Sequence, residues 1–467
     1  MNMIYQNNRV DDIKIAYIGG GSRGWAWTLM KDLAKATDIS GSVYLYDIDF
    51  EAAKNNETIG NRIEKGAWKY VAAPTIGEAL TGANFVIVSI LPGTFDEMES
   101  DVHAPEKYGV YQPVGDTTGP GGFIRSLRTV PIMQEIARAV REYCPKAWVI
   151  NYTNPMAVCV HALYKEFPEI KAFGCCHEVF GTQKLLAQAV NELKGEEVID
   201  LVSHEYTKKI LVNVVGVNHF TWMTEAHYEN LDLFEVYKNF VDKYYETGYI
   251  KDMPENWMNN AFKSAARLRF DLFKKYGYIA AAGDRHLAEF MDKDDYLDDP
   301  EHVRKWSFGL TTVAWRKNDL KERLEKSARL LSGEEKFVIK ASGEEGVQQI
   351  RAILGLENMV TNVNLPNYGQ IPNLPLGTVV ETNAAFRNDM VQPVYAGAIP
   401  DAIYPLISRI AEENNETVEA AFARDLTMAY KSFAKGHLLK TLTEEQKKEL
   451  FNTMCENTKE YLKDYHA

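Results

Sequence analysis

The hexapeptide GGGSRG constrains the fold of this chain more than any other stretch. It directly follows residues 13–20, which have the apolar pattern of a buried strand, and it opens residues 25–36, which have helical spacing. Gly19, Gly21 and Gly24 satisfy the G-x-G-x-x-G pattern, whose glycines allow a tight turn, close approach of a ligand and close packing of the helix. A glycine-rich turn in an unrelated α/β domain is the alternative. The strand–turn–helix context favours a dinucleotide-binding Rossmann unit.

Strand-like and helical segments continue to alternate along the first part of the chain. A regular alternation of this kind favours a parallel sheet with right-handed crossovers. We therefore expect an α/β fold, with a Rossmann-type doubly wound sheet in residues 1–205. The expected strands are 13–20, 42–49, the end of 77–91, 147–155 and 171–176.

The pattern changes after about residue 205, and we expect a second, mixed α+β domain over residues 206–467. No low-complexity linker separates the two parts, so we expect them to pack closely. The segments that carry this interpretation are paired strands at 208–226, helices at 256–276 and 302–333, proline-containing loop and strand at 365–386, and helices from 401 onward.

Composition excludes two classes of partner. The net charge of −13, with no Lys/Arg block, argues against nucleic acid and leaves any anionic ligand dependent on local cations. No apolar run reaches the roughly 18 residues of a membrane span, and the N-terminus lacks a signal-peptide pattern. The five cysteines form no regular framework. We therefore expect a cytoplasmic protein with neither a membrane nor a nucleic-acid partner.

The turn also indicates which dinucleotide binds. Asp47 lies near the end of the second expected strand, where a carboxylate accepts hydrogen bonds from a ribose 2′-hydroxyl and repels a 2′-phosphate. NAD is therefore favoured over NADP. Ser22 lies inside the glycine turn, at the helix N-terminus that faces a pyrophosphate. Pro92, in SILPGTFDE, ends the third expected strand at the crevice where doubly wound sheets bind ligands.

A second cluster of chemistry follows the short strand at 171–176. Cys176 and His177 stand there, and His219 ends another strand-like run, VGVNHFTW. A thiolate and an imidazole can hold a divalent metal, and two protein ligands suit an open site completed by substrate and water. Buried core positions are the alternative for each residue taken alone. Ligand softness by itself would favour zinc at such a thiolate site.

Six motifs in a fixed order connect the two clusters. They are KIAYIGGGSRGW, SILPGTFDE, GDTTGPGGFIRSLRTVP, NYTNPMAV, GCCHEVFG and GVNHFTW. This order resembles the NAD- and metal-dependent family 4 glycoside hydrolases, from about residue 13 to at least residue 290. The resemblance implies a fold like lactate and malate dehydrogenases, with Cys176 and His219 as the metal ligands and manganese as the usual metal. We also expect the chain to form a homodimer or homotetramer.

The residues after the metal cysteine vary with substrate in this family. Cys176-His177-Glu178-Val179 resembles the α-galacturonidase branch. Cys-His-Ser marks the α-glucosidases and α-galactosidases, which are the main alternative. We therefore expect a sugar substrate that is a uronic acid glycoside.

The family's reaction is oxidative, unlike that of ordinary glycosidases with two carboxylates. The resemblance implies that NAD takes a hydride from carbon 3 and that the metal stabilises the enediolate formed when a base removes the carbon 2 proton. The glycosidic oxygen then leaves, water adds, and the hydride returns. NAD is needed but not consumed.

The resemblance places the catalytic groups in two segments. The base is expected in 274–290, where Asp284 is favoured and Tyr278 is the alternative. His177 stands where the family has a general acid, and it could protonate the leaving oxygen or only hydrogen-bond the substrate.

The expected substrate contacts come from five segments. Asn154 and Asn218 match family substrate contacts, and Asp116 falls in a motif that resembles the family's site-lining loop, without an assigned role. Glu178 either orients His177 or binds a sugar hydroxyl. Arg285 is the expected partner of the substrate carboxylate, because a guanidinium matches a carboxylate in two parallel bonds. Pairing of Arg285 with Asp284 alone is the alternative.

Two functions of other classes share the fingerprint. A malate-like dehydrogenase would use an Arg and an Asp–His pair, which residues 284–286 could mimic, but it leaves the Cys176 and His219 motifs unexplained. Net NADH production would favour it. A non-catalytic NAD sensor would bind nucleotide without metal dependence.

Overall fold

A computed structural model describes residues 3–64, 67–250, 264–340 and 342–466. Within them, a ten-stranded sheet has the order β14-β13-β12-β7-β6-β5-β2-β3-β4, with β1 beside β2, and a four-stranded sheet contains β8 to β11. The strands are β1 Ile4–Gln6, β2 Arg9–Ile18, β3 Ile39–Tyr46, β4 Trp68–Ala72, β5 Phe85–Val88, β6 Trp148–Asn151, β7 Lys171–Gly174, β8 Ile210–Val217, β9 Phe220–Tyr228, β10 Leu231–Asp232, β11 Ile279–Ala280, β12 Met359–Pro366, β13 Val379–Arg387 and β14 Met390–Pro393.

Helices connect and cover these strands. The α-helices are α1 Trp25–Lys35, α2 Phe50–Asn61, α3 Ile76–Leu80, α4 Phe95–His103, α5 Gly119–Tyr143, α6 Met156–Glu166, α7 Glu178–Lys194, α8 Tyr206–Lys209, α9 Leu233–Tyr244, α11 Arg267–Tyr276, α12 Asp284–Phe290, α13 Lys293–Tyr296, α14 Pro300–Lys305, α15 Val313–Ser332, α16 Gly346–Ile353, α17 Tyr404–Ala423, α18 Leu426–Phe433 and α19 Glu444–Asn457.

The parallel half of the large sheet is doubly wound. From β4 through β3, β2, β5 and β6 to β7, each strand pairs with its neighbour in parallel. The chain starts in the middle of this set, at β2, builds outward to β4, and then returns to β5 on the other side of β2. The direction of winding therefore reverses between β2 and β5, which is where such sheets open a ligand crevice. The expected Rossmann-type α/β fold is confirmed.

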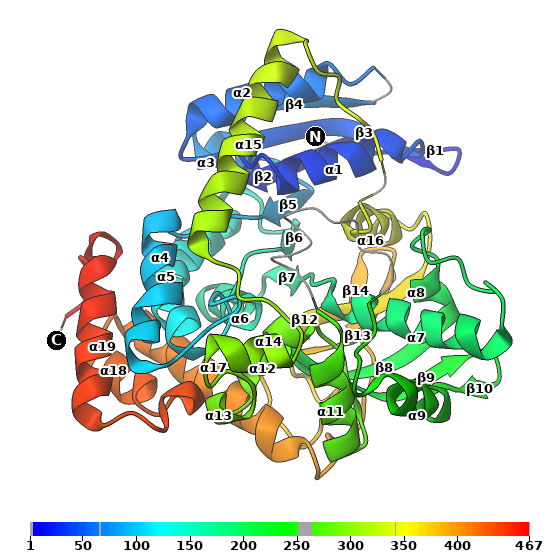
Figure 1. Cartoon of the computed structure of the whole chain (residues 1–467). Coiled ribbons are helices and arrows are strands. Elements are labelled where there is room, and N and C mark those ends of the chain that lie inside the picture. Colours follow the sequence, from blue (N-terminus) through cyan, green and yellow to red (C-terminus); the bar gives the residue numbers. More distant parts are fainter. Residues whose placement is uncertain (1–2, 65–66, 251–263, 341, 467) are drawn as a thin grey trace.

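Two apolar layers cover the sheet because side chains alternate along each strand. Ile15 and Tyr17 of β2 pack in the core that also holds α1 and α16, whereas Ala16 and Ile18 pack in the core that holds α5 and α6. The C-terminal helices α17 to α19, orange to red in Figure 1, lie beside α4 and α5 and extend the second layer.

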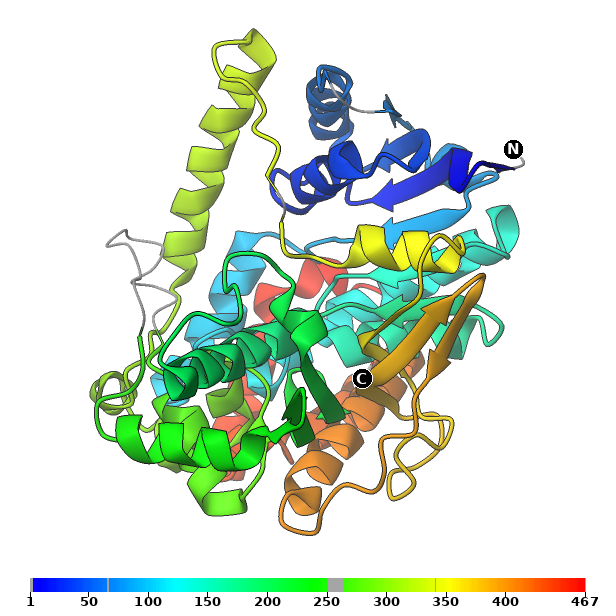
Figure 2. The ribbon, with the colours of Figure 1, turned by 90° about the vertical axis from the view of Figure 1, so that its right-hand side faces the viewer.

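The strands after residue 205 divide between the two sheets. β8 to β11 form the small sheet, which shares a core with α7, α9 and α11. β12 joins the large sheet through an antiparallel contact with β7, and β13 and β14 follow it antiparallel. The large sheet thus takes strands from both expected domains, and the boundary at residue 205 stays a prediction. Figure 2 shows the long helix α15 along one side of the molecule.

Most expected elements are present at the expected places. The paired strands at 208–226 are β8 and β9, and the 365–386 segment runs from the end of β12 through a loop into β13. Of the helix expected at 256–276, residues 256–263 lie outside the described residues, residues 264–266 are not helical, and α11 covers the rest. The short strand β4 was not expected, because its five residues alternate buried and exposed positions too briefly to give a clear pattern. No described helix is long and apolar enough to cross a bilayer.

Candidate active site

The glycine turn closes tightly onto the strand across the switch point. Gly19 has φ +94°, and a Cβ atom there would lie 2.0 Å from the Ser89 carbonyl oxygen, which follows β5. Only glycine fits both the backbone conformation and the space. The turn therefore lies over the carboxyl ends of β2 and β5, where the Rossmann crevice is expected.

Ser22 and Asp47 fix the shape of this turn. The Ser22 hydroxyl accepts hydrogen bonds from the amides of Gly24 (3.4 Å), the N-cap of α1, and Trp25 (3.2 Å), its first residue, so it holds the turn against the start of the helix. The Asp47 carboxylate accepts from the Gly21 amide at 2.8 Å and from the Asp49 amide at 3.0 Å. Asp47 thus ties the end of β3 to the turn, and its contact with a ribose stays a prediction.

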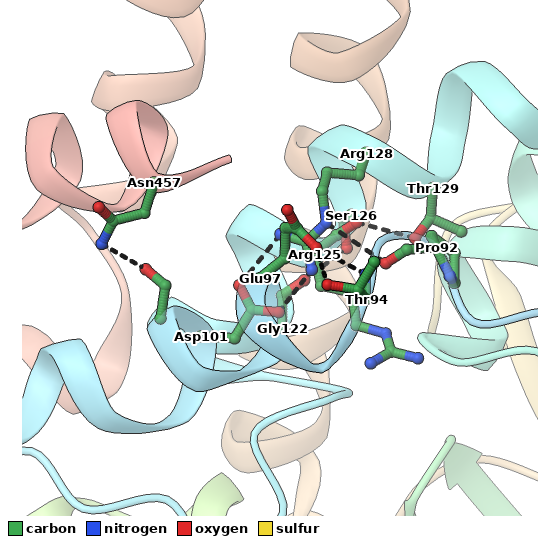
Figure 3. Close-up of polar contacts among 12 residues, drawn as sticks. Pro92, Thr94, Glu97, Asp101, Gly122, Arg125, Ser126, Arg128, Thr129 and Asn457 are labelled. Atoms are coloured by element: carbon green, nitrogen blue, oxygen red, sulfur yellow. Dashed lines mark hydrogen bonds and ion pairs between the residues drawn. The ribbon is translucent and has the colours of Figure 1, made fainter. Parts of the chain in front are cut away.

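The loop that carries Pro92 is anchored from α5. Arg128 donates two hydrogen bonds to the Asp101 carboxylate, at 3.0 and 2.5 Å, and its Nε donates to the Pro92 carbonyl at 3.4 Å. Both charged side chains are 1% exposed, and Figure 3 shows the polar contacts around them. A buried ion pair of this kind is stable only when its hydrogen bonds are satisfied, which fixes the loop against α4 and α5.

Cys176 and His219 stand on connections of the two sheets, and Asn218, the neighbour of His219, hydrogen-bonds Cys176. Cys176 lies between β7 and the N-terminus of α7, and His219 lies in the turn between β8 and β9. Both side chains are buried. Burial, with the nearby carboxylate of Glu381, raises the pKa of the Cys176 thiol well above its ordinary value. A bound cation would reverse this and favour the thiolate, because a coordinated thiol is deprotonated.

The Thr117 hydroxyl determines which nitrogen of His219 carries the proton. Thr117 Oγ1 is 2.8 Å from Asp116 Oδ1 and 3.1 Å from His219 Nδ1. Burial opposes ionisation of Asp116, but Arg125 and other cations lower its pKa, so it accepts the one hydroxyl proton. Thr117 must then accept from His219, which places the proton on Nδ1. The lone pair of Nε2 is left for a metal.

His219 is kept neutral by its surroundings. Burial and the adjacent His286 lower the pKa of His219 to about 3. The two rings stack with centroids 4.2 Å apart. A neutral imidazole is the form that binds a metal ion.

Glu178 lies close to the three histidines of the site. Its Oε2 accepts from the Gly283 amide at 2.7 Å, and its Oε1 lies 3.7 Å from His286 Nε2. Burial opposes its ionisation, but His286, His177 and His219 lower the pKa of Glu178 to about 2. Glu178 is therefore a carboxylate at neutral pH.

His177 lies at the edge of the site. Its side chain is 51% exposed, and its Nδ1 lies 3.1 Å from Glu344 Oε1. Desolvation opposes the charged ring, but Glu344 and Glu178 raise the pKa of His177 to about 9. His177 is therefore a protonated group at neutral pH, as a proton donor must be.

Four buried polar atoms around this cluster lack a hydrogen-bond partner among the described residues. They are Asn154 Oδ1, Asn218 Oδ1, Arg125 Nη1 and His286 Nδ1. Buried polar groups in folded proteins nearly always have partners, so such a group of unpartnered atoms indicates a ligand site. Asn218 also donates to Glu381 at 2.9 Å, and Arg125 Nε donates to the Asn154 carbonyl at 3.3 Å.

The expected catalytic residues of segment 274–290 lie apart from each other. Asp284 is fully buried, accepts from the amides of Leu268 (3.4 Å) and Arg269 (3.3 Å), and lies 3.5 Å from the Arg269 guanidinium. β11 pairs with β9 through Ile279–Met223 and Ala280–Trp222. Tyr278 precedes Ile279 and therefore lies at one end of this pairing, whereas His219 precedes β9 and lies beyond the opposite end. The structure therefore does not bring Tyr278 into the cluster.

Arg285 turns away from its neighbour Asp284. Its Nη2 donates to the Pro113 carbonyl at 2.9 Å, and it also bonds the Thr311 hydroxyl. Its side chain is buried. The expected pairing with a substrate carboxylate stays a prediction.

Sequence reasoning missed several groups that the fold brings to the site. Glu381 of β13 accepts from Asn218 and, at 2.6 Å, from Asn362 of β12, whose amide also donates to the Cys176 carbonyl. A glutamate inside an apolar strand was the available signal. Thr117 and Arg125 lie within the GDTTGPGGFIRS motif, and His286 directly follows Arg285.

Within the described ranges no group of three or more His, Cys, Asp and Glu side chains is arranged to hold a metal ion. Cys176 and His219, the ligands that the sequence motifs predict, would then supply two protein ligands. The remaining positions would fall to substrate and water, as in an open catalytic site.

The fold and the site define a Rossmann-fold protein with a buried thiol–imidazole pair beside its crevice. The model of the family 4 glycosyl hydrolases matches residues 14–192, and that of the family 4 glycosyl hydrolase C-terminal domain matches residues 214–438. The chain belongs to the family 4 glycosyl hydrolases, and the resemblance seen in its sequence motifs is confirmed.

Individual relatives agree with this placement. An α-galacturonidase from Thermoanaerobacterium saccharolyticum is 58% identical over 98% of each chain. The solved structure of lplD from Bacillus subtilis is 50% identical, covers 95% of this chain and 100% of its own, and superposes with a TM-score of 0.90. The 6-phospho-β-glucosidase from Thermotoga maritima, solved with manganese, NAD+ and glucose-6-phosphate, shares the fold at 22% identity, a TM-score of 0.75 and 96% and 99% coverage.

Proposed function

We propose that this enzyme hydrolyses α-galacturonides, with NAD in the crevice over the glycine turn and a divalent metal ion, manganese, at Cys176 and His219. The substrate in this proposal is supported by four relatives named α-galacturonidase, which are 50–58% identical to this chain over nearly its whole length. Relatives named α-galactosidase and α-glucosidase are 28% and 26% identical.

One observation carries the proposed location of the sugar. Asn154, Asn218, Arg125 and His286 carry unpartnered buried polar atoms. Asn218 adjoins His219, the His286 ring stacks on that of His219, and Arg125 bonds Asn154. An amide oxygen accepts a hydrogen bond from a sugar hydroxyl, and a guanidinium donates to an oxygen. A sugar bound there would satisfy atoms that otherwise remain buried without partners.

NAD, when bound, would supply a hydride acceptor, and a divalent metal ion held by Cys176 and His219 would supply Lewis acidity to the sugar. His219 presents Nε2 because Thr117 holds its Nδ1 proton. His177, charged and half-exposed, delivers a proton to the glycosidic oxygen as it leaves. Glu178, with Oε1 3.7 Å from His286 Nε2, holds His286 against the ring of His219.

The general base stays a prediction with Asp284 and Tyr278 as candidates. Burial raises the pKa of Asp284, which helps a carboxyl act as a base near neutral pH. Its oxygens are, however, enclosed by α11. Comparison of Asp284→Asn with Tyr278→Phe, measured by exchange of the carbon 2 proton with solvent, separates the two assignments.

A uronate carboxylate needs a local cation because the net charge of the chain is −13. We propose Arg125 for this role, since its Nη1 is buried and unpartnered beside Asn154. Arg285 is the alternative drawn from the sequence. The diagnostic quantity is the ratio of kcat/KM for an α-galacturonide to that for the matching α-galactoside, which only the true partner of the carboxylate should lower.

The whole proposal is tested with nitrophenyl glycosides in the presence of NAD, Mn²⁺ and a thiol reductant. We expect cleavage of the α-galacturonide, loss of activity when NAD or metal is removed, and no net NADH. A wild-type preference for the α-galactoside or α-glucoside would overturn the substrate. Net NADH formation without cleavage would instead indicate a dehydrogenase.

A cytoplasmic location and a homodimeric or homotetrameric state complete the proposal. All five cysteines are free thiols, which suits a reducing compartment. Light scattering of the purified chain tests the oligomeric state.

A further inference from the structure

Two side chains of α12 hold the same piece of backbone. Arg285 Nη2 donates to the Pro113 carbonyl at 2.9 Å, and Glu289 Oε1 accepts from the amides of Val114 (2.6 Å) and Gly115 (2.9 Å). Arg285 and Glu289 stand four residues apart and so share one face of the helix. One turn of α12 thus contacts three consecutive residues of another segment.

The held segment, residues 113–117, lies outside any helix or strand. Its backbone groups therefore depend on side chains and neighbouring loops for hydrogen bonds. The amide of Thr311 adds a second donor to the Pro113 carbonyl, at 3.2 Å. Gly115 has φ +67°, and a Cβ there would lie 2.8 Å from Val102, so the segment has little room to shift.

This segment leads directly to the groups that orient His219. Asp116 and Thr117 follow Gly115, and Thr117 contacts His219 Nδ1 at 3.1 Å. Partners of a metal-binding histidine of this kind set the ring orientation and contribute to metal affinity. A displacement of residues 113–115 would carry Thr117 away from His219.

We propose that Arg285 and Glu289 are positioning residues, which hold residues 113–117 so that Thr117 fixes the proton and ring of His219. The proposal rests on the proposed function, because it requires His219 to bind the metal. Glu289 is 1% exposed, and its carboxyl contacts the backbone amides instead of reaching the sugar site. It acts on the metal only through the segment it holds.

The first test compares Mn²⁺ affinity, measured by titration calorimetry with NAD present. Glu289→Ala removes the acceptor and should weaken Mn²⁺ binding about 10- to 100-fold, the usual loss for such indirect partners. Glu289→Gln keeps an oxygen that can accept from both amides, so it should stay within about threefold of wild type. Equal affinity in wild type and Glu289→Ala would overturn the proposal.

Asp271→Ala is the matched control. Asp271 is also a buried carboxylate. It accepts hydrogen bonds from Tyr245 (2.6 Å) and Tyr296 (2.5 Å) and pairs with Lys275 at 3.0 Å, and none of these partners lies in residues 113–117. We expect it to lower stability and to leave Mn²⁺ affinity within about threefold of wild type. If Glu289→Ala does not fold, Glu289→Asp replaces it, because the shorter side chain cannot reach both amides. Unchanged Mn²⁺ affinity in Glu289→Asp would then overturn the proposal.

A double mutant separates positioning from general damage. In a Thr117→Val background the link to His219 is already broken, so Glu289→Ala should cause little further loss of Mn²⁺ affinity. Full additivity of the two losses would show that Glu289 acts by another route and would overturn the proposal.

The specificity of Arg285→Lys distinguishes positioning from substrate recognition. A positioning role lowers kcat/KM for the α-galacturonide and the α-galactoside by the same factor, whereas selective loss for the galacturonide overturns it for Arg285. These outcomes are separate from failure of the proposed function, which would appear in the wild type as absence of Mn²⁺ binding or of galacturonide cleavage.

Discussion

Thr117→Val is the substitution that most directly tests how the site prepares His219. Valine has nearly the shape of threonine, so the backbone of residues 113–117 should stay in place. The change removes the hydroxyl that is 2.8 Å from Asp116 and 3.1 Å from His219. His219 then loses the group that holds its proton on Nδ1 and its ring in position.

The size of the effect follows from the two lost hydrogen bonds. A hydrogen bond to a charged group contributes about 1.5–3 kcal/mol, and the bond to Asp116 is of that kind. Loss of the bond to Asp116 destabilises the metal-free and the metal-bound protein about equally, so it changes the Mn²⁺ affinity little. The part that affects metal affinity is the bond to His219, which strengthens when a cation draws charge from the ring. We estimate about 1.5 kcal/mol for this difference, or about a tenfold weaker Mn²⁺ affinity.

Thr118→Val is the control, because Thr118 is as buried as its neighbour, at 7% exposure for each. Titration calorimetry with Mn²⁺ measures the affinity, and the electron paramagnetic resonance spectrum of bound Mn²⁺ reports its symmetry. We expect Thr117→Val to change both and Thr118→Val to change neither. Equal affinity in the two variants would refute the assigned tautomer and its source.

Three further outcomes are expected. Cys176→Ser should abolish activity while NAD binding, followed by fluorescence, persists, because the glycine turn lies on separate strands; full activity without added metal would contradict the metal site. Deuterium at carbon 2 of the substrate should exchange with solvent or slow turnover, and retention of the label through many turnovers would indicate conventional hydrolysis. Burial raises the pKa of Glu289 from 4.5 to about 8, so the folded state prefers the protonated form, and the free energy of unfolding should fall as pH rises from about 4.5 to 8. Glu289→Gln should flatten this dependence in urea titrations, and an unchanged slope would show that Glu289 is ionised when folded.

Local sequence patterns were sufficient to predict those parts of the structure that depend on short stretches of chain. The glycine turn needs a strand before it and a helix after it, and both are visible in the sequence. At Gly19, the positive φ angle and the close approach of the Ser89 carbonyl oxygen leave no room for a side chain. The motifs of Cys176 and His219 likewise indicated the chemistry before their proximity was known.

Pairing between distant strands was not available from these patterns. β12 begins 79 residues after β11, the last strand of the small sheet, yet β12 to β14 join the large sheet beside β7. An apolar strand pattern shows that a strand is buried but does not identify its neighbour. Glu381 reaches Asn218 only through this pairing.

The sequence by itself determined the Rossmann unit, the family and the residue types of the site, because each depends on spacing along a few residues. Only the tertiary structure decided the direction of individual side chains. Arg285 directly follows Asp284, yet it bonds Pro113, 172 residues earlier in the chain, while Asp284 is enclosed by α11. Adjacent residues of a helix point about 100° apart, so the elements packed on each face determine which groups they meet.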